Sequence, residues 1–138
     1  MEPVIIYTDG ASRGNPGHAA YGVVVLDFRS ETIYEISDYL GQATNNVAEY
    51  RGLLAGLEKA AALGAEEVIL YADSELIIRQ LLGQYQVKSE GLRPLYDEAR
   101  ALIARFAKFK PIHIAREANT RADSLANRAI ERALAENV

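Results

Sequence analysis

Two apolar stretches of the sequence end in the same way, with an aspartate. Residues 4–10 read VIIYTDG and residues 68–74 read VILYADS, so Asp9 and Asp73 follow equivalent runs. Runs that are apolar on both faces are typical of central parallel strands covered by helices. Parallel strands end at the same edge of a sheet, where open α/β sheets bind their ligands. We therefore expect Asp9 and Asp73 to lie close together.

Neighbouring carboxylates repel each other, and a divalent cation between them relieves that repulsion. A site built of oxygen ligands alone favours hard ions such as Mg²⁺ or Mn²⁺. Glu49 stands at the head of an otherwise uncharged stripe of a predicted helix, and Asp123 lies in the first turn of another. Both side chains could reach the same site from helix ends, which gives four candidate metal ligands.

Taken one at a time, each acid also has a structural interpretation. Asp9 precedes a glycine and could be a turn residue, and Asp73 could stabilise a helix N-terminus. Glu49 stands three residues after Asn46, the spacing of a capping box, and Asp123 has the same relation to a threonine. The hypothesis of a metal site therefore depends on the joint arrangement of the acids.

Hydrophobic periodicity and turn-forming residues predict the elements that position these acids. Strands are predicted at residues 4–8, 21–28, 32–40, 67–72 and 111–115, and helices at 46–63, 74–83, 92–109 and 120–136. The resulting order, βββαβααβα, predicts an α/β fold in which three antiparallel strands precede parallel ones. We expect a five-stranded mixed sheet flanked by helices, in a single domain over residues 1–138.

The composition limits the classes of function. The sequence has 138 residues and no cysteine, so disulfides, thiolate nucleophiles and thiolate metal sites are excluded. It shows neither a signal-peptide pattern nor an apolar run that could span a bilayer, so we expect a cytoplasmic protein without a membrane partner. The net charge is −4: residues 1–74 hold 11 acids and 4 bases, and residues 75–138 hold 8 acids and 11 bases. Bound divalent cations would offset this charge, which therefore permits a nucleic-acid substrate without arguing for one.

Four stretches that span nearly the whole chain, in order, resemble the motifs of type 1 ribonuclease H. They read YTDGASRGNPG at 7–17, TNNVAE at 44–49, YADS at 71–74 and NTRADSLA at 119–126. The resemblance implies the ribonuclease H-like fold and an endonuclease that hydrolyses the RNA strand of RNA–DNA hybrids, leaving 5′-phosphate and 3′-hydroxyl ends. We expect a monomer that needs no protein partner.

The same resemblance implies two Mg²⁺ ions per site, with Mn²⁺ as a possible substitute. Asp9 would bridge both ions, Glu49 and Asp73 would complete the shell of one, and Asp123 that of the other. No protein nucleophile is needed, in agreement with the absence of cysteine.

The resemblance also implies contacts to the hybrid. A loop backbone and the Glu49 carboxylate would contact the RNA 2′-hydroxyl, three amide side chains would read the minor groove, and a pocket would hold a phosphate of the DNA strand. The backbone that would contact the 2′-hydroxyl is that of Gly10, Ala11 and Ser12. The amides that would read the minor groove are those of Asn15, Asn45 and Gln80, and the phosphate pocket would be formed by Thr44, Asn46 and Lys88. Helix capping and turn formation are the alternative roles of the asparagines.

The sequence departs from the family pattern in two places. Many members carry a histidine in a loop before the fourth acid, whereas residues 115–119 read AREAN; we predict that Arg116 or Glu117 partly substitutes for it. His113 falls in a predicted strand and His18 follows the first turn, so structural and surface roles are expected for them. Residues 84–91 contain Lys88 as their only base, so the usual basic protrusion is missing and weak, salt-sensitive binding is expected.

Three alternatives remain open from the sequence. One is another nuclease of the same superfamily, which would cut plain duplex DNA. A second is a non-catalytic module that binds hybrids or RNA, although clustered acids facing phosphate give a binding module no advantage. A third is a metabolic α/β enzyme that acts on a small phosphorylated substrate, which the glycine-rich stretch 10–17 alone would permit.

Overall fold

The structure, a computed structural model, describes residues 2–136. One sheet contains the strands β1 (Val4–Gly14), β2 (Gly17–Leu26), β3 (Thr32–Ala43), β4 (Glu67–Ala72) and β5 (Lys108–His113). The helices are α1 (Asn45–Ala62), α2 (Glu75–Leu81), α3 (Arg93–Ile103) and α4 (Thr120–Glu136), and a short 3-10 helix (Arg116–Ala118) precedes α4. This order confirms the predicted succession of elements.

The sheet is mixed, as predicted, with the strand order β3-β2-β1-β4-β5. β1, β2 and β3 pair in antiparallel fashion, whereas β4 pairs in parallel with both β1 and β5. The central strand β1 therefore has the antiparallel strand β2 on one side and the parallel strand β4 on the other. In its carboxyl half, beyond Thr8, it pairs with β2 and no longer with β4.

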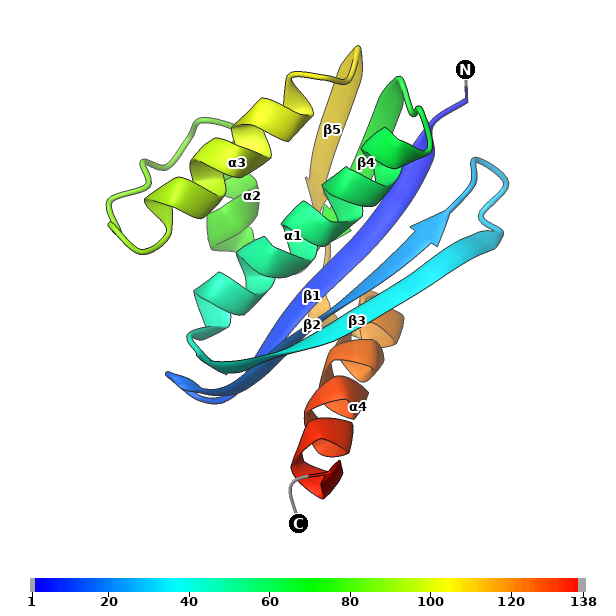
Figure 1. The fold of residues 1–138 in the computed structure, drawn as a ribbon. Coiled ribbons are helices and arrows are strands. Elements are labelled where there is room, and N and C mark those ends of the chain that lie inside the picture. The colour runs from blue at the N-terminus through cyan, green and yellow to red at the C-terminus, as the bar shows by residue number, and fades with distance from the viewer. Residues whose placement is uncertain (1, 137–138) are drawn as a thin grey trace.

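Helices cover the two faces of the sheet unequally (Figure 1). α1 packs against β1 and β2 on one face, with α3 beside it, and its apolar side chains form the main core with those of the strands. On the other face α4 packs against β1, β2 and β3 around a smaller cluster that contains Ala20, Ala129 and Ile130. None of the helices within residues 2–136 is long and apolar enough to cross a bilayer.

β1 is longer than the sequence predicted. The predicted strand stopped at residue 8, but the observed strand runs on through Asp9 and Gly10 to Gly14, because it continues to pair with β2. Its pairing with β4 does end at Thr8, opposite Ala72. The interpretation of Asp9 as a turn residue was therefore wrong, whereas its expected place at the end of the parallel ladder was right.

The boundary between α3 and β5 also differs from the prediction. α3 ends at Ile103, and β5 already begins at Lys108, where a helix had been expected to continue to residue 109. Phe109 is half-buried between the exposed Lys108 and Lys110, which is the two-residue alternation of a strand. Pro111 is accommodated because β5 lies at an edge of the sheet.

Two glycines allow helices to approach the sheet closely from opposite faces. A Cβ atom on Gly10 would lie 2.3 Å from the backbone nitrogen of Glu49 in α1. A Cβ atom on Gly22, the residue that pairs with Asp9, would lie 2.1 Å from the backbone oxygen of Ala122 in α4. Both helices therefore touch strand backbone next to Asp9, and each brings one of the predicted acids to it.

Candidate metal site

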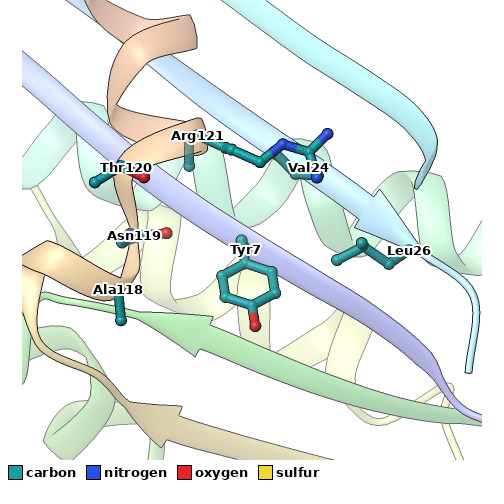
Figure 2. Close-up of a pocket in the computed structure, with 8 residues that line it drawn as sticks. Tyr7, Val24, Leu26, Ala118, Asn119, Thr120 and Arg121 are labelled. Atoms are coloured by element: carbon teal, nitrogen blue, oxygen red, sulfur yellow. The ribbon is translucent and has the colours of Figure 1, made fainter. Parts of the chain in front are cut away.

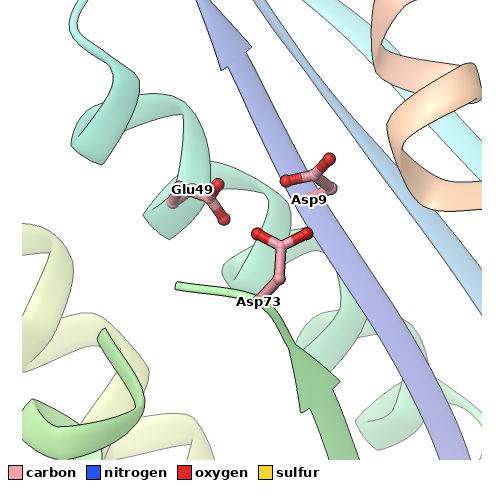
Figure 3. Close-up of side chains that lie close together, drawn as sticks. All are labelled: Asp9, Glu49 and Asp73. Atoms are coloured by element: carbon pink, nitrogen blue, oxygen red, sulfur yellow. The ribbon is translucent and has the colours of Figure 1, made fainter. Parts of the chain in front are cut away.

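Three of the four predicted acids meet at the end of the parallel ladder (Figure 3). One carboxylate oxygen from each of Asp9, Glu49 and Asp73 lies within 4.8 Å of the others. Asp9 projects from β1, Asp73 follows β4 directly, and Glu49 comes from the first half of α1. Residues far apart in the sequence are thus gathered at the sheet edge where they were expected.

Burial gives this cluster unusual electrostatics. Asp9 and Glu49 are each only 5% exposed. Burial, reinforced by the charge of Asp73, raises the pKa of Asp9 to about 7, and a hydrogen bond with Glu49 opposes part of that rise. Burial and the charge of Asp9 hold the pKa of Glu49 well above its usual range, although the Gly10 N–H donates to its carboxylate. Negative charge is therefore unfavourable here unless a cation balances it.

Asp123 joins the cluster from the opposite face of the sheet. It lies in the first turn of α4, half-buried, and its backbone N–H donates to the Asn119 carbonyl at 3.2 Å. Its carboxylate is within hydrogen-bonding reach of Asp9, where it contributes to the raised pKa of that residue. Asp9 consequently contacts Glu49 on one side and Asp123 on the other, and so stands between the remaining acids.

The donor set fits a divalent cation. All the ligand atoms are carboxylate oxygens, which hard cations such as Mg²⁺ and Mn²⁺ prefer. The pKa values of Asp9 and Glu49 are raised first by burial and then by the neighbouring carboxylates, so a bound cation would relieve the cost of their negative charge. Divalent cation binding is therefore the chemistry that this arrangement supports.

Asn119, for which no role was predicted from the sequence, lies at the cluster. It is 1% exposed, and its amide nitrogen donates both to the Thr8 carbonyl at 2.9 Å and to Oδ2 of Asp73 at 3.1 Å. One turn beyond Asp123, the Asn127 amide donates to Oδ1 of that residue at 3.2 Å. The burial of Asn119, which draws attention to the first of these contacts, is known only from the structure.

Several predicted substrate residues lie where the β1–β2 hairpin meets the start of α1. The β1–β2 hairpin lies against the start of α1: Asn15 accepts from the Asn45 backbone N–H at 3.1 Å, and the Ser12 hydroxyl donates to the Ala43 carbonyl at 2.9 Å. Thr44 is the N-cap of α1 and accepts from Val47 N–H. The capping-box interpretation of Asn46 and Glu49 was therefore wrong, because the helix begins two residues earlier than that pattern requires.

The other predicted substrate residues are placed differently. Ala11 is half-buried on β1 and Gly10 is fully covered, in contact with α1. Gln80 is only 3% exposed, and its carbonyl oxygen accepts from the Tyr50 hydroxyl. Lys88 is exposed on the segment between α2 and α3. A role in substrate binding stays a prediction for each of these residues, and Gln80 would have to leave its buried partner to fulfil it.

The residues predicted to replace the loop histidine lie just before α4, and the two histidines of the sequence lie on β2 and β5. Arg116 and Glu117 are exposed on the 3-10 helix that leads into Asn119, so their predicted substitution for a histidine stays a prediction. His113 is exposed at the end of β5. His18 is half-buried rather than fully exposed, because its Nδ1 hydrogen-bonds the Tyr39 hydroxyl at 2.7 Å.

A small pocket lies next to these residues, on the α4 side of the sheet. It has a volume of about 230 Å³, and Figure 2 shows Asn119, Thr120 and Arg121 along one wall and Tyr7 across from them. Val24 and Leu26 make its floor apolar. The carboxylate cluster does not line this pocket, so the pocket and the candidate metal site are separate features that share Asn119 as a boundary.

The chain matches, over residues 7–129, a family model described as reverse transcriptase-like. It is 47% identical over 131 residues to a bifunctional protein of Mycobacterium tuberculosis, covering 94% of this chain and 36% of that protein. It thus spans about a third of the length of this relative. The solved structure of the N-terminal ribonuclease H domain of that protein superposes with a TM-score of 0.95 at 43% identity, and covers both chains completely.

Two further proteins are similar over most of the chain. The ribonuclease HI of Halobacterium salinarum is 43% identical over 125 residues, which are 91% of this chain and 63% of that protein. LC11 ribonuclease H1, solved in complex with an RNA/DNA hybrid, has a TM-score of 0.90 at 43% identity and covers 95% of this chain and 99% of its own. The chain therefore belongs to the reverse transcriptase-like family, as a ribonuclease H-like domain with type 1 ribonucleases H among its relatives.

Proposed function

We propose that the protein hydrolyses the RNA strand of RNA–DNA hybrids endonucleolytically, leaving 5′-phosphate and 3′-hydroxyl ends. The observation that carries this proposal is the meeting of Asp9, Glu49 and Asp73 within 4.8 Å at the sheet edge. A protein with the same fold and 43% identity has been solved with an RNA/DNA hybrid, which supports the same class of substrate here.

The proposed site uses two divalent cations, Mg²⁺ with Mn²⁺ as a substitute. Asp9 is proposed as the shared ligand, with Glu49 and Asp73 on one side and Asp123 on the other. The contacts of Asp9 with acids on both sides support this division. When bound, such cations neutralise charge that develops on the scissile phosphate and lower the pKa of an attacking water molecule. The carboxylates orient the phosphate by fixing where the cations lie.

The proposed recognition of the hybrid uses residues of the β1–β2 hairpin and of the start of α1. Asn15 accepts from the Asn45 backbone N–H there, and Asn45 lies one helical turn before Glu49, whose carboxylate would accept from the RNA 2′-hydroxyl. Thr44 and Asn46 lie at a helix N-terminus without acids in its first turn, which favours a phosphate of the DNA strand. Lys88, Gln80 and the backbone of residues 10–12 complete the proposed contacts.

The deciding experiment is Mg²⁺-dependent digestion of an end-labelled RNA–DNA hybrid. We expect the wild type to cut the RNA strand and Asp73→Asn to lose activity by on the order of a hundredfold or more, since it removes a ligand charge. Asp97→Asn is the matched control, because Asp97 is an exposed acid of α3 paired with Arg93 and should cut normally. Product ends are checked by phosphatase and ligase treatment.

The same assay separates the alternatives. Cleavage of plain duplex DNA with the hybrid spared would identify a different nuclease of the superfamily. Hybrid that is bound but intact with both Mg²⁺ and Mn²⁺ would identify a non-catalytic binding module. Activity on a small phosphate ester alone would identify a metabolic enzyme.

We further propose that one domain over residues 1–138 acts as a monomer in the cytoplasm. The described strands form a single sheet against which the helices pack, and this supports one domain. The absence of cysteine means that an oxidising compartment would add no disulfide. Light scattering of the purified protein tests the monomer, and a dimer mass would contradict it.

A further inference from the structure

Two of the acids around Asp9, namely Asp73 and Asp123, each have their own asparagine partner. Asn119 donates to Oδ2 of Asp73 at 3.1 Å, and Asn127 donates to Oδ1 of Asp123 at 3.2 Å. We propose that these asparagines are positioning residues that set two cation positions separately, Asn119 through Asp73 and Asn127 through Asp123. This inference rests on the proposed two-cation function and goes beyond it by assigning residues that are not ligands.

The contacts of Asn119 tie together three segments that carry acids. Its side-chain nitrogen donates to the Thr8 carbonyl, next to Asp9, and to the Asp73 carboxylate. Its backbone carbonyl accepts from the Asp123 backbone N–H. The residue is 1% exposed, so this amide is held away from solvent. A shift of Asn119 would therefore move Asp73 relative to Asp9.

The other half of the Asn119 amide shows which contacts decide its orientation. Its side-chain oxygen Oδ1 is buried and finds no hydrogen-bond partner among the described residues. Turning the amide over would bring this oxygen against the Asp73 carboxylate, where both atoms are acceptors. The two hydrogen bonds of the side-chain nitrogen thus outweigh the cost of leaving the side-chain oxygen buried without a partner. This is expected of a residue whose role is to position the Asp73 carboxylate.

Asn127 holds Asp123 from one turn further along α4. Its amide nitrogen donates to the Asp123 carbonyl at 3.0 Å as well as to the carboxylate. Its oxygen faces Arg13 of the hairpin at 3.5 Å, and Arg13 also pairs with Glu131 at 3.2 Å. The orientation of Asp123 is thereby linked to the hairpin that carries the proposed substrate contacts.

A hydrogen bond to one carboxylate oxygen leaves the other oxygen for a cation and limits the rotation of the group. Such partners of metal ligands change metal affinity by about 10- to 100-fold when removed. Because Asp73 belongs to the cluster within 4.8 Å and the Asp123 carboxylate is held by a different asparagine, the two asparagines should affect different binding events.

The test measures Mn²⁺ binding to the hybrid-free protein by electron paramagnetic resonance, and separately the Mn²⁺ dependence of hybrid cleavage. Asn119→Ala should weaken Mn²⁺ binding to the free protein about tenfold. Asn127→Ala should leave that binding unchanged, yet raise the Mn²⁺ concentration for half-maximal cleavage about fivefold or more, with the same KM for the hybrid. Asn127→Gln, which keeps a donor, should recover part of the loss.

Controls separate positioning from folding. Ser124→Ala, at an exposed position of α4, should behave as the wild type in both assays. Thermal unfolding identifies variants that fail to fold. If Asn119→Ala fails to fold, Asn119→Ser, which has a smaller polar side chain, is used in its place.

Wild-type Mn²⁺ affinity in a folded Asn119 variant would overturn the assignment of that residue. An Asn127→Ala variant that loses Mn²⁺ binding to the free protein as strongly as Asn119→Ala would overturn the division of labour. If the wild type binds Mn²⁺ but cuts no hybrid, the proposed function fails while the binding arm still decides the role of Asn119.

Discussion

A negative charge on Asp9 is unfavourable, because the residue is buried beside other carboxylates. Its pKa is raised from 3.8 to about 7 in the folded protein, so between these values the folded protein holds a proton that the unfolded chain has released. The stabilisation from this proton is fully present below about pH 4 and is lost as the pH rises through 7. The metal-free protein should therefore lose stability over this range.

Asp9→Asn removes the contribution of Asp9 to this dependence, since an amide does not ionise. At pH 8 without metal we expect the variant to be more stable than the wild type by on the order of 4 kcal/mol, the equivalent of the pKa difference. At pH 4 the two should be nearly equal. Urea unfolding in EDTA across this range measures the difference, and parallel stability curves would contradict the raised pKa.

The acids of the site could be predicted from the sequence, but their supporting residues could not. Asp9 and Asp73 end matching apolar runs, and this local pattern already indicates a shared sheet edge. The Asn119 amide contacts Thr8 and Asp73, which are 111 and 46 residues away, and no spacing rule links such positions. The contact of Gln80 with Tyr50 was missed for the same reason, since the two residues lie 30 positions apart.

At the scale of elements, β4 and α4 have the predicted bounds, whereas β1 and α3 do not. β4 is short and lies between β1 and β5, so its own run of apolar residues determines where it begins and ends. The length of β1 depends on the partner β2, which keeps pairing through Gly10, and the end of α3 depends on β5 pairing with β4. Boundaries set by such non-local pairing cannot be read from a local pattern.

The N-cap of α1 offers a test that separates stability from substrate binding. Thr44 and Ser74 cap α1 and α2 in the same way, through a side-chain oxygen that accepts from the N–H three residues on. Thr44→Ala and Ser74→Ala should each lower the free energy of unfolding by about 1 kcal/mol. Only Thr44→Ala should also raise the KM for the hybrid, by a few fold, because Thr44 is proposed to contact a DNA phosphate. Equal KM values in steady-state kinetics would remove Thr44 from that pocket.

The approach of α4 to β2 depends on Gly22. A Cβ atom there would lie 2.1 Å from a backbone oxygen and 2.8 Å from Leu125 Cβ, so Gly22→Ala must push α4 outward and Asp123 with it. We expect destabilisation of about 1–3 kcal/mol and at least a tenfold loss of cleavage under conditions where the variant is folded. Gly91→Ala is the matched control, since its nearest neighbour would be Ser89 Oγ at 3.8 Å. A fully active Gly22→Ala would show that α4 need not approach so closely.

At the scale of the whole molecule, the charge of −4 sets how the protein meets a polyanion. Because the net charge is negative, affinity for a hybrid should be modest, and it should fall as salt increases in proportion to the number of phosphate contacts. The KM should therefore rise strongly between about 50 and 200 mM salt. A KM that is independent of salt would mean that the main contacts to the hybrid are not ionic.

Lys88 should account for one of these ionic contacts. Lys88→Ala should raise the KM at low salt and reduce the slope of log KM against log salt by about 1, as for one lost phosphate contact. Lys59→Ala is the control, because Lys59 lies in the last turn of α1, at the opposite end of the helix from the cluster, against the Tyr34 ring. An unchanged slope in Lys88→Ala would place the hybrid elsewhere on the surface.

Gly10 and Gly22 have a consequence for how a cation and the fold depend on each other. Because α1 and α4 press on adjoining strand residues from opposite sides, the ligands come together only when both helices have docked on the finished sheet. A partly unfolded chain would offer scattered acids of low affinity, so the ion acts as a ligand of the native state alone. At a hundred times its dissociation constant such a ligand adds about 2.7 kcal/mol to the stability of the protein.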